Sequence, residues 1–192
     1  PTLLRWMERH RPRAYAEILA ADRRAVEERG HGNAVAQVYN HVILPLANPR
    51  DRHTQVLWGI ADFEHRFQRR PEGMWLPETA VDLETLDILA EHGIRFTILA
   101  PHQAKRVKPI DGGEWLDVGG GKIDPTRPYL ARLPSGRTIA VFFYDGAISH
   151  AVAFEGLLSN GERFAHRLLE AAAPDRSGPL LVHIATDGES YG

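Results

Sequence analysis

The chain has 192 residues, a length that fits one domain or a large piece of one. A composition of 43% hydrophobic and 25% charged residues is ordinary for a globular protein, and a net charge of −2 offers no basic surface for nucleic acid. The sequence contains no cysteine, which excludes disulfides and thiolate sites, and no apolar run approaches the roughly 18–20 residues of a membrane span. We therefore expect a cytoplasmic protein with neither nucleic-acid nor membrane partners.

The first part of the chain predicts helices separated by turns. Residues 2–29 predict two helical pieces, with Pro12 in the first turn of the second piece and Gly30 ending it. Residues 34–46 predict a strand followed by its strand-end loop, with a helical turn as the alternative for the first half. Residues 51–69 predict a third helix. The apolar residues of that helix recur at helical spacing and predict a face that packs on a sheet: Val56, Leu57, Ile60, Phe63 and Phe67.

The segment 73–80, GMWLPETA, organises the rest of the prediction. Its apolar run Met74-Trp75-Leu76 predicts a short buried strand, and Pro77 ends the strand because proline has no backbone N–H to donate. Glu78 is then expected just beyond the carboxyl end of a strand, where α/β folds bind substrates. Glu78 is therefore a candidate nucleophile or general base; stabilisation of the next helix dipole explains it equally well.

After Glu78 the chain predicts a helix over residues 83–92, capped by Asp82 and ended by Gly93, with Leu83, Leu86 and Leu89 on its buried face. A strand over 94–99 follows, and then a long irregular loop over 105–127 that holds Trp115. Trp115 could stack on a flat ligand face or plug the space beneath the loop. The remaining predicted elements are strands over 129–133 and 138–144 joined as a hairpin, helices over 147–154 and 162–173, and a buried strand over 179–185.

The alternation of strands and helices with short turns predicts an α/β fold, mostly parallel strands with crossover helices. Parallel strands bring their carboxyl ends to one edge, so four carboxylates are expected on one rim: Glu78, Asp145, Asp187 and Glu189. His41 and His102 are expected there too, although either could be an ordinary core or loop histidine. Glycoside cleavage needs two carboxyl groups, which favours that chemistry. Metal binding and helix capping are the alternatives, and the sequence has no His-Glu-x-x-His or related zinc spacing, so no metal site is predicted.

Several segments resemble glycoside hydrolase family 57. GMWLPETA resembles its nucleophile region, ATDGESYG its general-acid region, and YNHVILPL a segment upstream of the nucleophile; GIRFTILAP also fits. These segments occur in the family's order, while the family's early His-Gln-Pro segment is absent and Thr79 stands where many members have Cys. The chain starts at Pro1 and stops at Gly192, and we expect a partial catalytic barrel truncated at both ends, from a divergent member of the family.

The resemblance implies an incomplete (β/α)7 barrel and a retaining hydrolase or transglycosylase of the α-amylase, branching-enzyme or 4-α-glucanotransferase type, acting on α-glucans without a cofactor. It implies that Glu78 is the nucleophile and Asp187 the general acid/base. His41 would contact the sugar, with Trp75 and Glu189 supporting the site, and Asp145 and Trp115 are further expected substrate contacts. A catalytically inactive carbohydrate-binding homologue and a metal-dependent polysaccharide deacetylase are the alternative functions.

Overall fold

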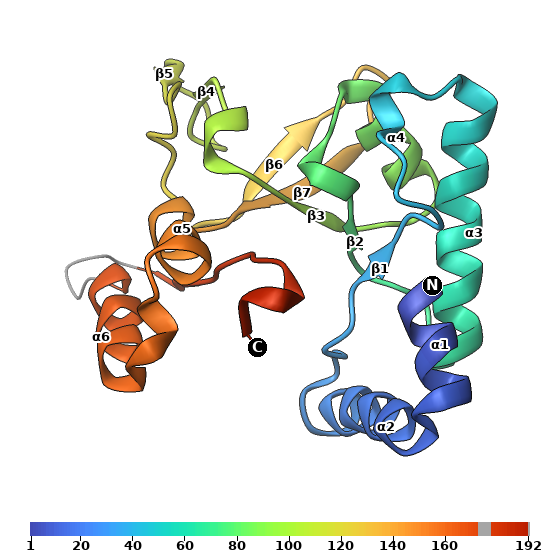
Figure 1. Cartoon of the computed structure of the whole chain (residues 1–192). Helices are drawn as coiled ribbons and strands as arrows, with labels where there is room; N and C mark the ends of the chain where they lie inside the picture. The colour runs from blue at the N-terminus through green and yellow to red at the C-terminus, as the bar shows by residue number, and fades with distance from the viewer. Residues whose placement is uncertain (173–177, 192) are drawn as a thin grey trace. The chain divides into compact units, whose positions relative to one another are not determined.

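The computed structural model describes residues 1–172 and 178–191 (Figure 1). The chain divides into two compact units, the first formed by Pro1–Thr97 with Leu130–Ala140 and the second by Ile98–Tyr129 with Val141–Gly192. The described strands form three small sheets, so the α/β class is confirmed. Among the described residues, no helix combines the length and the apolar character that a membrane span requires.

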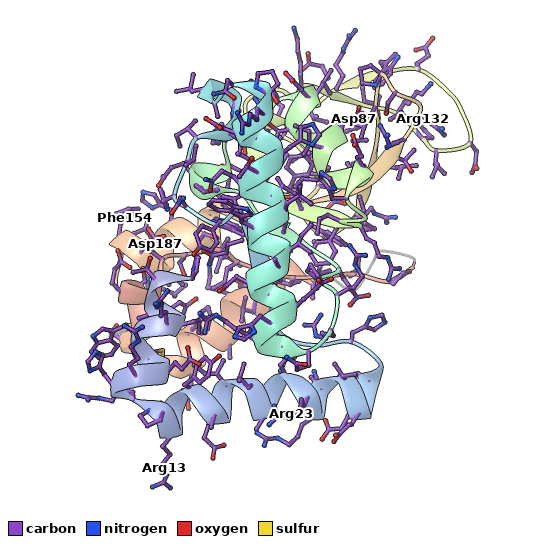
Figure 2. All side chains as sticks on the ribbon, turned by 90° about the vertical axis from the view of Figure 1, so that its right-hand side faces the viewer. Arg13, Arg23, Asp87, Arg132, Phe154 and Asp187 are labelled. Atoms are coloured by element: carbon purple, nitrogen blue, oxygen red, sulfur yellow. The ribbon has the colours of Figure 1, made fainter. Side chains whose placement is uncertain are left out.

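Four helices belong to the first unit: α1 (Thr2–His10), α2 (Pro12–Arg29), α3 (Pro49–Phe67) and α4 (Leu83–Glu91). The two N-terminal helices are confirmed; α2 begins at Pro12 and ends at Gly30, whose φ of 76° suits glycine. Figure 2 shows Arg13 and Arg23 pointing outward from α2. The third helix begins slightly earlier than predicted, because the side chain of Asn48 accepts a hydrogen bond from the Asp51 N–H and caps it there.

The described strands of the first two sheets are short. β1 (Ala36–Gln37) pairs in parallel with β2 (Met74–Trp75), with Ala36 opposite Met74, and each strand leads into a 3₁₀ turn, Leu44–Leu46 and Pro77–Thr79. The strand predicted over 34–46 is confirmed only at Ala36–Gln37. A second sheet has the order β3 (Phe96–Leu99), β7 (Thr138–Phe143), β6 (Tyr129–Arg132), which confirms the predicted hairpin with the long apolar strand in the middle.

The core of the first unit confirms most of the predicted apolar faces. Val56, Ile60 and Phe63 of α3 and Leu86 and Leu89 of α4 are at most 6% exposed. The structure corrects two positions. Leu57 is 46% exposed, because one residue along a helix turns by about 100° away from the stripe. Leu83 is 57% exposed, because the first residue of α4 lies at the end of the helix, outside the core that Leu86 and Leu89 enter.

The second unit contains α5 (Gly146–Phe154), α6 (Gly161–Ala171) and an antiparallel ribbon of β4 (Arg106–Val107) with β5 (Leu116–Asp117). One cluster of its buried apolar residues consists of Ile148, Ala151, Val152 and Leu157. The ribbon corrects the prediction of a wholly irregular loop over 105–127. Both predicted helices are confirmed; the predicted end of the second, at residue 173, lies outside the described residues.

The strand predicted over 179–185 is wrong: these residues form no strand, and each is half-buried or exposed. Their backbone groups bond to scattered partners. The Leu181 N–H donates to the Thr126 carbonyl, the His183 carbonyl accepts from the Asp145 N–H, and the Ala185 N–H donates to the Ser149 hydroxyl. A β-strand requires regular hydrogen bonds between its successive residues and one neighbouring strand. Apolar composition alone does not provide that neighbouring strand. The predicted barrel stays a prediction, since the described strands form separate small sheets.

A buried ion pair joins the segments of the first unit. Asp22 on α2 is 2% exposed and accepts hydrogen bonds from Arg69 Nε and Nη2 at 2.8 and 2.9 Å and from the Ala34 N–H at 2.7 Å. The hydrogen bond from Arg69 lowers the pKa of Asp22 below its ordinary value of 3.8; burial opposes that shift and the Ala34 N–H adds to it. Asp22 therefore links α2 to the chain that enters β1 and to the chain that leaves α3.

We expect Asp22→Asn to lower the free energy of unfolding by about 3 kcal/mol at pH 7, because Arg69 would keep its charge in a buried site without a counterion. Urea unfolding measures this. Folding lowers the pKa of Asp22, so its charge contributes fully to the free energy of unfolding at pH values above the ordinary carboxyl pKa. That contribution is lost as the pH falls through the lowered pKa of the folded state. The difference between the wild type and Asp22→Asn should therefore shrink below about pH 4.

Glu17→Gln is the matched control, since Glu17 is exposed on the same helix. Its effect should stay within about 0.5 kcal/mol. A difference between Asp22→Asn and the wild type that stays constant from pH 7 to pH 3 would contradict the assignment.

Candidate active site

The parallel register of β1 and β2 brings His41 and Glu78 together. Gln37 lies opposite Trp75, so the segments that follow these two residues leave the sheet at the same edge. His41 Nε2 lies 2.8 Å from Glu78 Oε1, and both side chains remain largely exposed, at 72% and 69%. Since a carboxylate only accepts, the hydrogen must be on His41 Nε2. The structure thus joins two residues that the sequence placed on the same rim.

The turn that carries Glu78 is strained. Glu78 has φ of 56° and ψ of 19°, and Thr79 has φ of 53°, so two successive residues with side chains adopt the left-handed conformation. Such a conformation is unusual for a β-branched residue and costs of the order of 1–3 kcal/mol per residue. Hydrogen bonds from the Thr79 N–H to the Leu76 carbonyl and from the Ala80 N–H to the Pro77 carbonyl close the turn. Backbone strain of this kind is concentrated at functional sites in proteins.

Arg52 holds the two segments that flank this site. Its guanidinium is buried, with Nη1 donating to Asp82 and Glu84 at 2.9 Å each, Nη2 to the Pro45 carbonyl at 2.8 Å and Nε to the Ala47 carbonyl at 3.0 Å. Pro45 and Ala47 follow His41 in the chain, and Asp82 follows Glu78. Asp82 also accepts from the Thr85 N–H and so caps α4, as predicted. Arg52 therefore bridges the segments that follow His41 and Glu78, and no sequence motif indicated these contacts.

Trp75 is half-buried and alternates along β2 with Met74, which is 0% exposed. The two side chains therefore point to opposite faces of the strand. The supporting role expected of Trp75 stays a prediction.

In the second unit, Asp187 and Glu189 line a cavity of about 550 Å³. Both side chains are exposed, and Figure 2 labels Asp187 and Phe154, another residue of the cavity wall. The wall combines apolar and hydrogen-bonding side chains: Pro101, His102, Tyr144, Ser149, His150, Ala153, Phe154, Thr186 and Ser190. His102 therefore shares a cavity with both predicted acidic residues, whereas His41 pairs with Glu78 in the first unit.

The turn around Asp187 is closed by two hydrogen bonds. The Ser190 N–H donates to the Asp187 carbonyl at 3.1 Å, and the Thr186 hydroxyl donates to the Tyr191 hydroxyl at 2.9 Å. Burial raises the pKa of Tyr144, which keeps the phenol protonated and able to donate in the cavity wall. A carboxylate beside hydroxyl groups in a cavity of this size suits the binding of a polar small molecule.

Asp145 caps α5. Its carboxylate accepts from the Ile148 N–H at 2.9 Å, and its own N–H donates to the His183 carbonyl at 2.9 Å. Burial lowers the pKa of His183, whose Nε2 atom is buried without a hydrogen-bond partner among the described residues. The predicted substrate contact of Asp145 stays a prediction; the capping alternative accounts for the geometry observed.

Trp115 is 56% exposed, so the alternative of a plug beneath the loop is wrong. Arg106 lies 5.5 Å and Lys108 5.2 Å from the centre of its ring, distances at which cations are attracted to the indole. Stacking of Trp115 on a ligand stays a prediction.

An exposed carboxylate on a strained turn at a strand end, within an α/β chain, is typical of the active-site edge of an α/β enzyme. The model of glycosyl hydrolase family 57 matches residues 2–192, and the chain belongs to that family. The resemblance seen in the sequence is thereby confirmed.

The relatives agree with this assignment. Alpha-amylase 1 of Dictyoglomus thermophilum is 24% identical over 190 residues, covering 99% of this chain and 24% of that protein. The crystal structure of the 4-alpha-glucanotransferase from Thermococcus litoralis superposes with a TM-score of 0.67 at 23% identity, over 99% of this chain and 26% of that one. The crystal structure of a maltose-forming amylase from Pyrococcus sp. ST04 superposes with a TM-score of 0.69 at 20% identity, over 98% of this chain and 29% of that one. The chain spans about a quarter of the length of the curated relatives it matches.

We expect Arg52→Lys to lower the free energy of unfolding by about 2 kcal/mol, because an ammonium group cannot reach two carbonyls and two carboxylates at once. Chemical denaturation measures this. Arg50→Lys, at an exposed position in the same turn of α3, is the control and should change stability little. Equal stability of both variants and the wild type would show that Arg52 is not the anchor described.

Proposed function

We propose that the protein is a retaining glycoside hydrolase or transglycosylase that acts on α-glucans, with Glu78 as nucleophile and Asp187 as general acid/base. The observation that carries this proposal is that a chain matching family 57 over residues 2–192 presents Glu78 on a strained strand-end turn, hydrogen-bonded to His41. The names of its relatives, amylase and 4-alpha-glucanotransferase, support α-glucans as the substrate class.

In the first proposed step, a Glu78 oxygen attacks the anomeric carbon while the Asp187 carboxyl group donates its proton to the departing glycosidic oxygen. The carbon–oxygen bond of the glycoside breaks and an ester bond to Glu78 forms. In the second step, the Asp187 carboxylate removes a proton from water or a sugar hydroxyl, whose oxygen attacks the same carbon and releases Glu78. Water as the acceptor gives hydrolysis, and a sugar hydroxyl gives transfer. This mechanism requires the two carboxyl groups to be about 5–5.5 Å apart.

His41 would direct the attack by Glu78. Its Nε2–H occupies Glu78 Oε1 at 2.8 Å, which leaves Oε2 as the attacking atom. The exposed His41 ring can also contact the sugar. Trp75, Glu189, Asp145 and Trp115 complete the proposed substrate contacts, and the proposed scaffold is the incomplete (β/α)7 barrel. The cytoplasmic location expected from the cysteine-free sequence also stays a prediction.

We expect Glu78→Gln to reduce kcat on amylose by about 10⁴-fold or more, because an amide cannot form the covalent intermediate. A 2-deoxy-2-fluoro glycosyl fluoride should label the wild type, and mass mapping should place the label on residues 73–80. Glu17→Gln is the control and should label normally. Binding of maltooligosaccharide without label or turnover in the wild type would favour the inactive carbohydrate-binding homologue.

We expect Asp187→Asn to lower kcat/KM by about 10²–10⁴-fold on amylose but far less on glycosyl fluorides, because kcat/KM reports the step that breaks the glycosidic bond and a fluoride leaving group needs no proton. Steady-state rates on both substrates measure the contrast. Equal losses on the two substrates would contradict the role of Asp187 as general acid. Activity abolished by exhaustive chelation, with acetate released from acetylated polysaccharide, would instead identify a metal-dependent deacetylase.

A further inference from the structure

We propose that His53, Glu91 and His92 form a zinc-class metal site that joins α3 to α4. This site is distinct from the carboxylates described above and does not depend on the proposed glycosidase activity. The sequence spacing gave no sign of it, because His53 lies on α3 while Glu91 and His92 end α4.

The distances between the three side chains fit one cation. His53 Nδ1 lies 3.2 Å from His92 Nε2, and one ligand atom of each residue, including a Glu91 carboxylate oxygen, lies within 4.8 Å of the others. A tetrahedral zinc ion with Zn–N bonds of 2.0–2.1 Å holds two nitrogens about 3.3–3.4 Å apart. The two imidazole rings are perpendicular, at 90°, with centres 5.4 Å apart, so they meet by their edges rather than by stacking.

In the absence of metal, one ring donates an N–H to the lone pair of the other. A cation would replace that shared hydrogen, which moves to the opposite nitrogen of the donor ring, so that both facing nitrogens offer lone pairs. Both histidines are half-buried, which restricts their side chains, whereas Glu91 is exposed and can turn toward the ion. The site therefore holds two of its three ligands in place before metal arrives.

The neighbouring charges leave Glu91 available. Arg137 Nη2 approaches Glu91 at 3.8 Å, a long and solvent-screened pair that a dication can replace. Arg137 also pairs with Asp87 at 3.3 Å, one helical turn before Glu91 on α4, and Figure 2 labels Asp87. Arg70 donates to the His92 carbonyl at 3.4 Å and pairs with Glu64 at 3.3 Å, so its charge already has a partner.

Two imidazoles and one carboxylate favour zinc and similar transition metals over calcium or magnesium, which prefer oxygen ligands. Water would occupy the fourth position. Since His53 follows Arg52 directly, the ion would reinforce the same α3–α4 contact that Arg52 makes through Asp82 and Glu84. Its expected effect is therefore on stability.

The test is titration of chelator-treated protein with zinc, followed by calorimetry, and with cobalt, followed by its visible absorption. We expect one equivalent to bind and to raise the Tm. His53→Gln and His92→Gln should each weaken binding by at least about 10–100-fold, the loss caused by removing even an indirect partner of a metal ligand. His166→Gln is the matched control, because His166 also pairs with a glutamate, Glu170, but on exposed α6.

Thermal melting of each variant in the presence of chelator shows whether the metal-free variant folds. A folded variant that binds less metal has lost the binding site and not its structure. Glu91→Gln gives a second measurement on an exposed side chain, and it should weaken binding without changing the Tm of the metal-free protein. The proposal is overturned if the wild type takes up no stoichiometric zinc or cobalt, or if His53→Gln and His92→Gln bind both metals as the wild type does.

Discussion

The buried guanidinium of Arg52 ties together the two segments that follow His41 and Glu78. Arg52 is 8% exposed, and such a cation is stable only where hydrogen bonds and negative charges surround it. The chain meets this requirement with two backbone carbonyls from the segment after β1 and two carboxylates from the start of α4. These segments are the continuations of the loops that carry His41 and Glu78. The need to satisfy Arg52 therefore fixes both loops against α3.

Contacts on both sides of the Pro77–Thr79 turn explain how its strained conformation persists. Left-handed conformations at Glu78 and Thr79 would relax if the flanking chain could move. On one side, Met74 and Leu76 are 0% exposed and hold the end of β2 in the core. On the other side, Asp82 is bonded to Arg52 and to the first turn of α4. With both ends held, the turn projects the Glu78 carboxylate outward to His41 instead of back along the strand.

Local signals predicted the parts of the fold that depend on neighbours in the chain. Pro12, Gly30 and Asp82 mark helix ends correctly, and the GMWLPETA segment places Glu78 just after a strand. Features that depend on distant partners escaped prediction. Arg52 binds residues up to 32 positions away, and His53 meets His92 across 39, with no periodic pattern to reveal either contact. The apolar run at 179–185 was misassigned for the same reason, since a strand exists only where another strand pairs with it.

The two candidate carboxylates are positioned by different physical means. Glu78 lies on a turn held by a buried cation, a packed strand and a histidine, so its geometry is set by interactions that span the first unit. Asp187 lies on a turn closed by bonds among near neighbours, Ser190 to Asp187 and Thr186 to Tyr191, beside a cavity with hydroxyl and imidazole groups in its wall. A nucleophile must approach one carbon atom from a narrow range of directions, and rigid anchoring of its side chain favours that alignment. In the proposed mechanism, Asp187 first donates and then accepts a proton at two different oxygens, and a locally closed turn next to a cavity is compatible with that exchange.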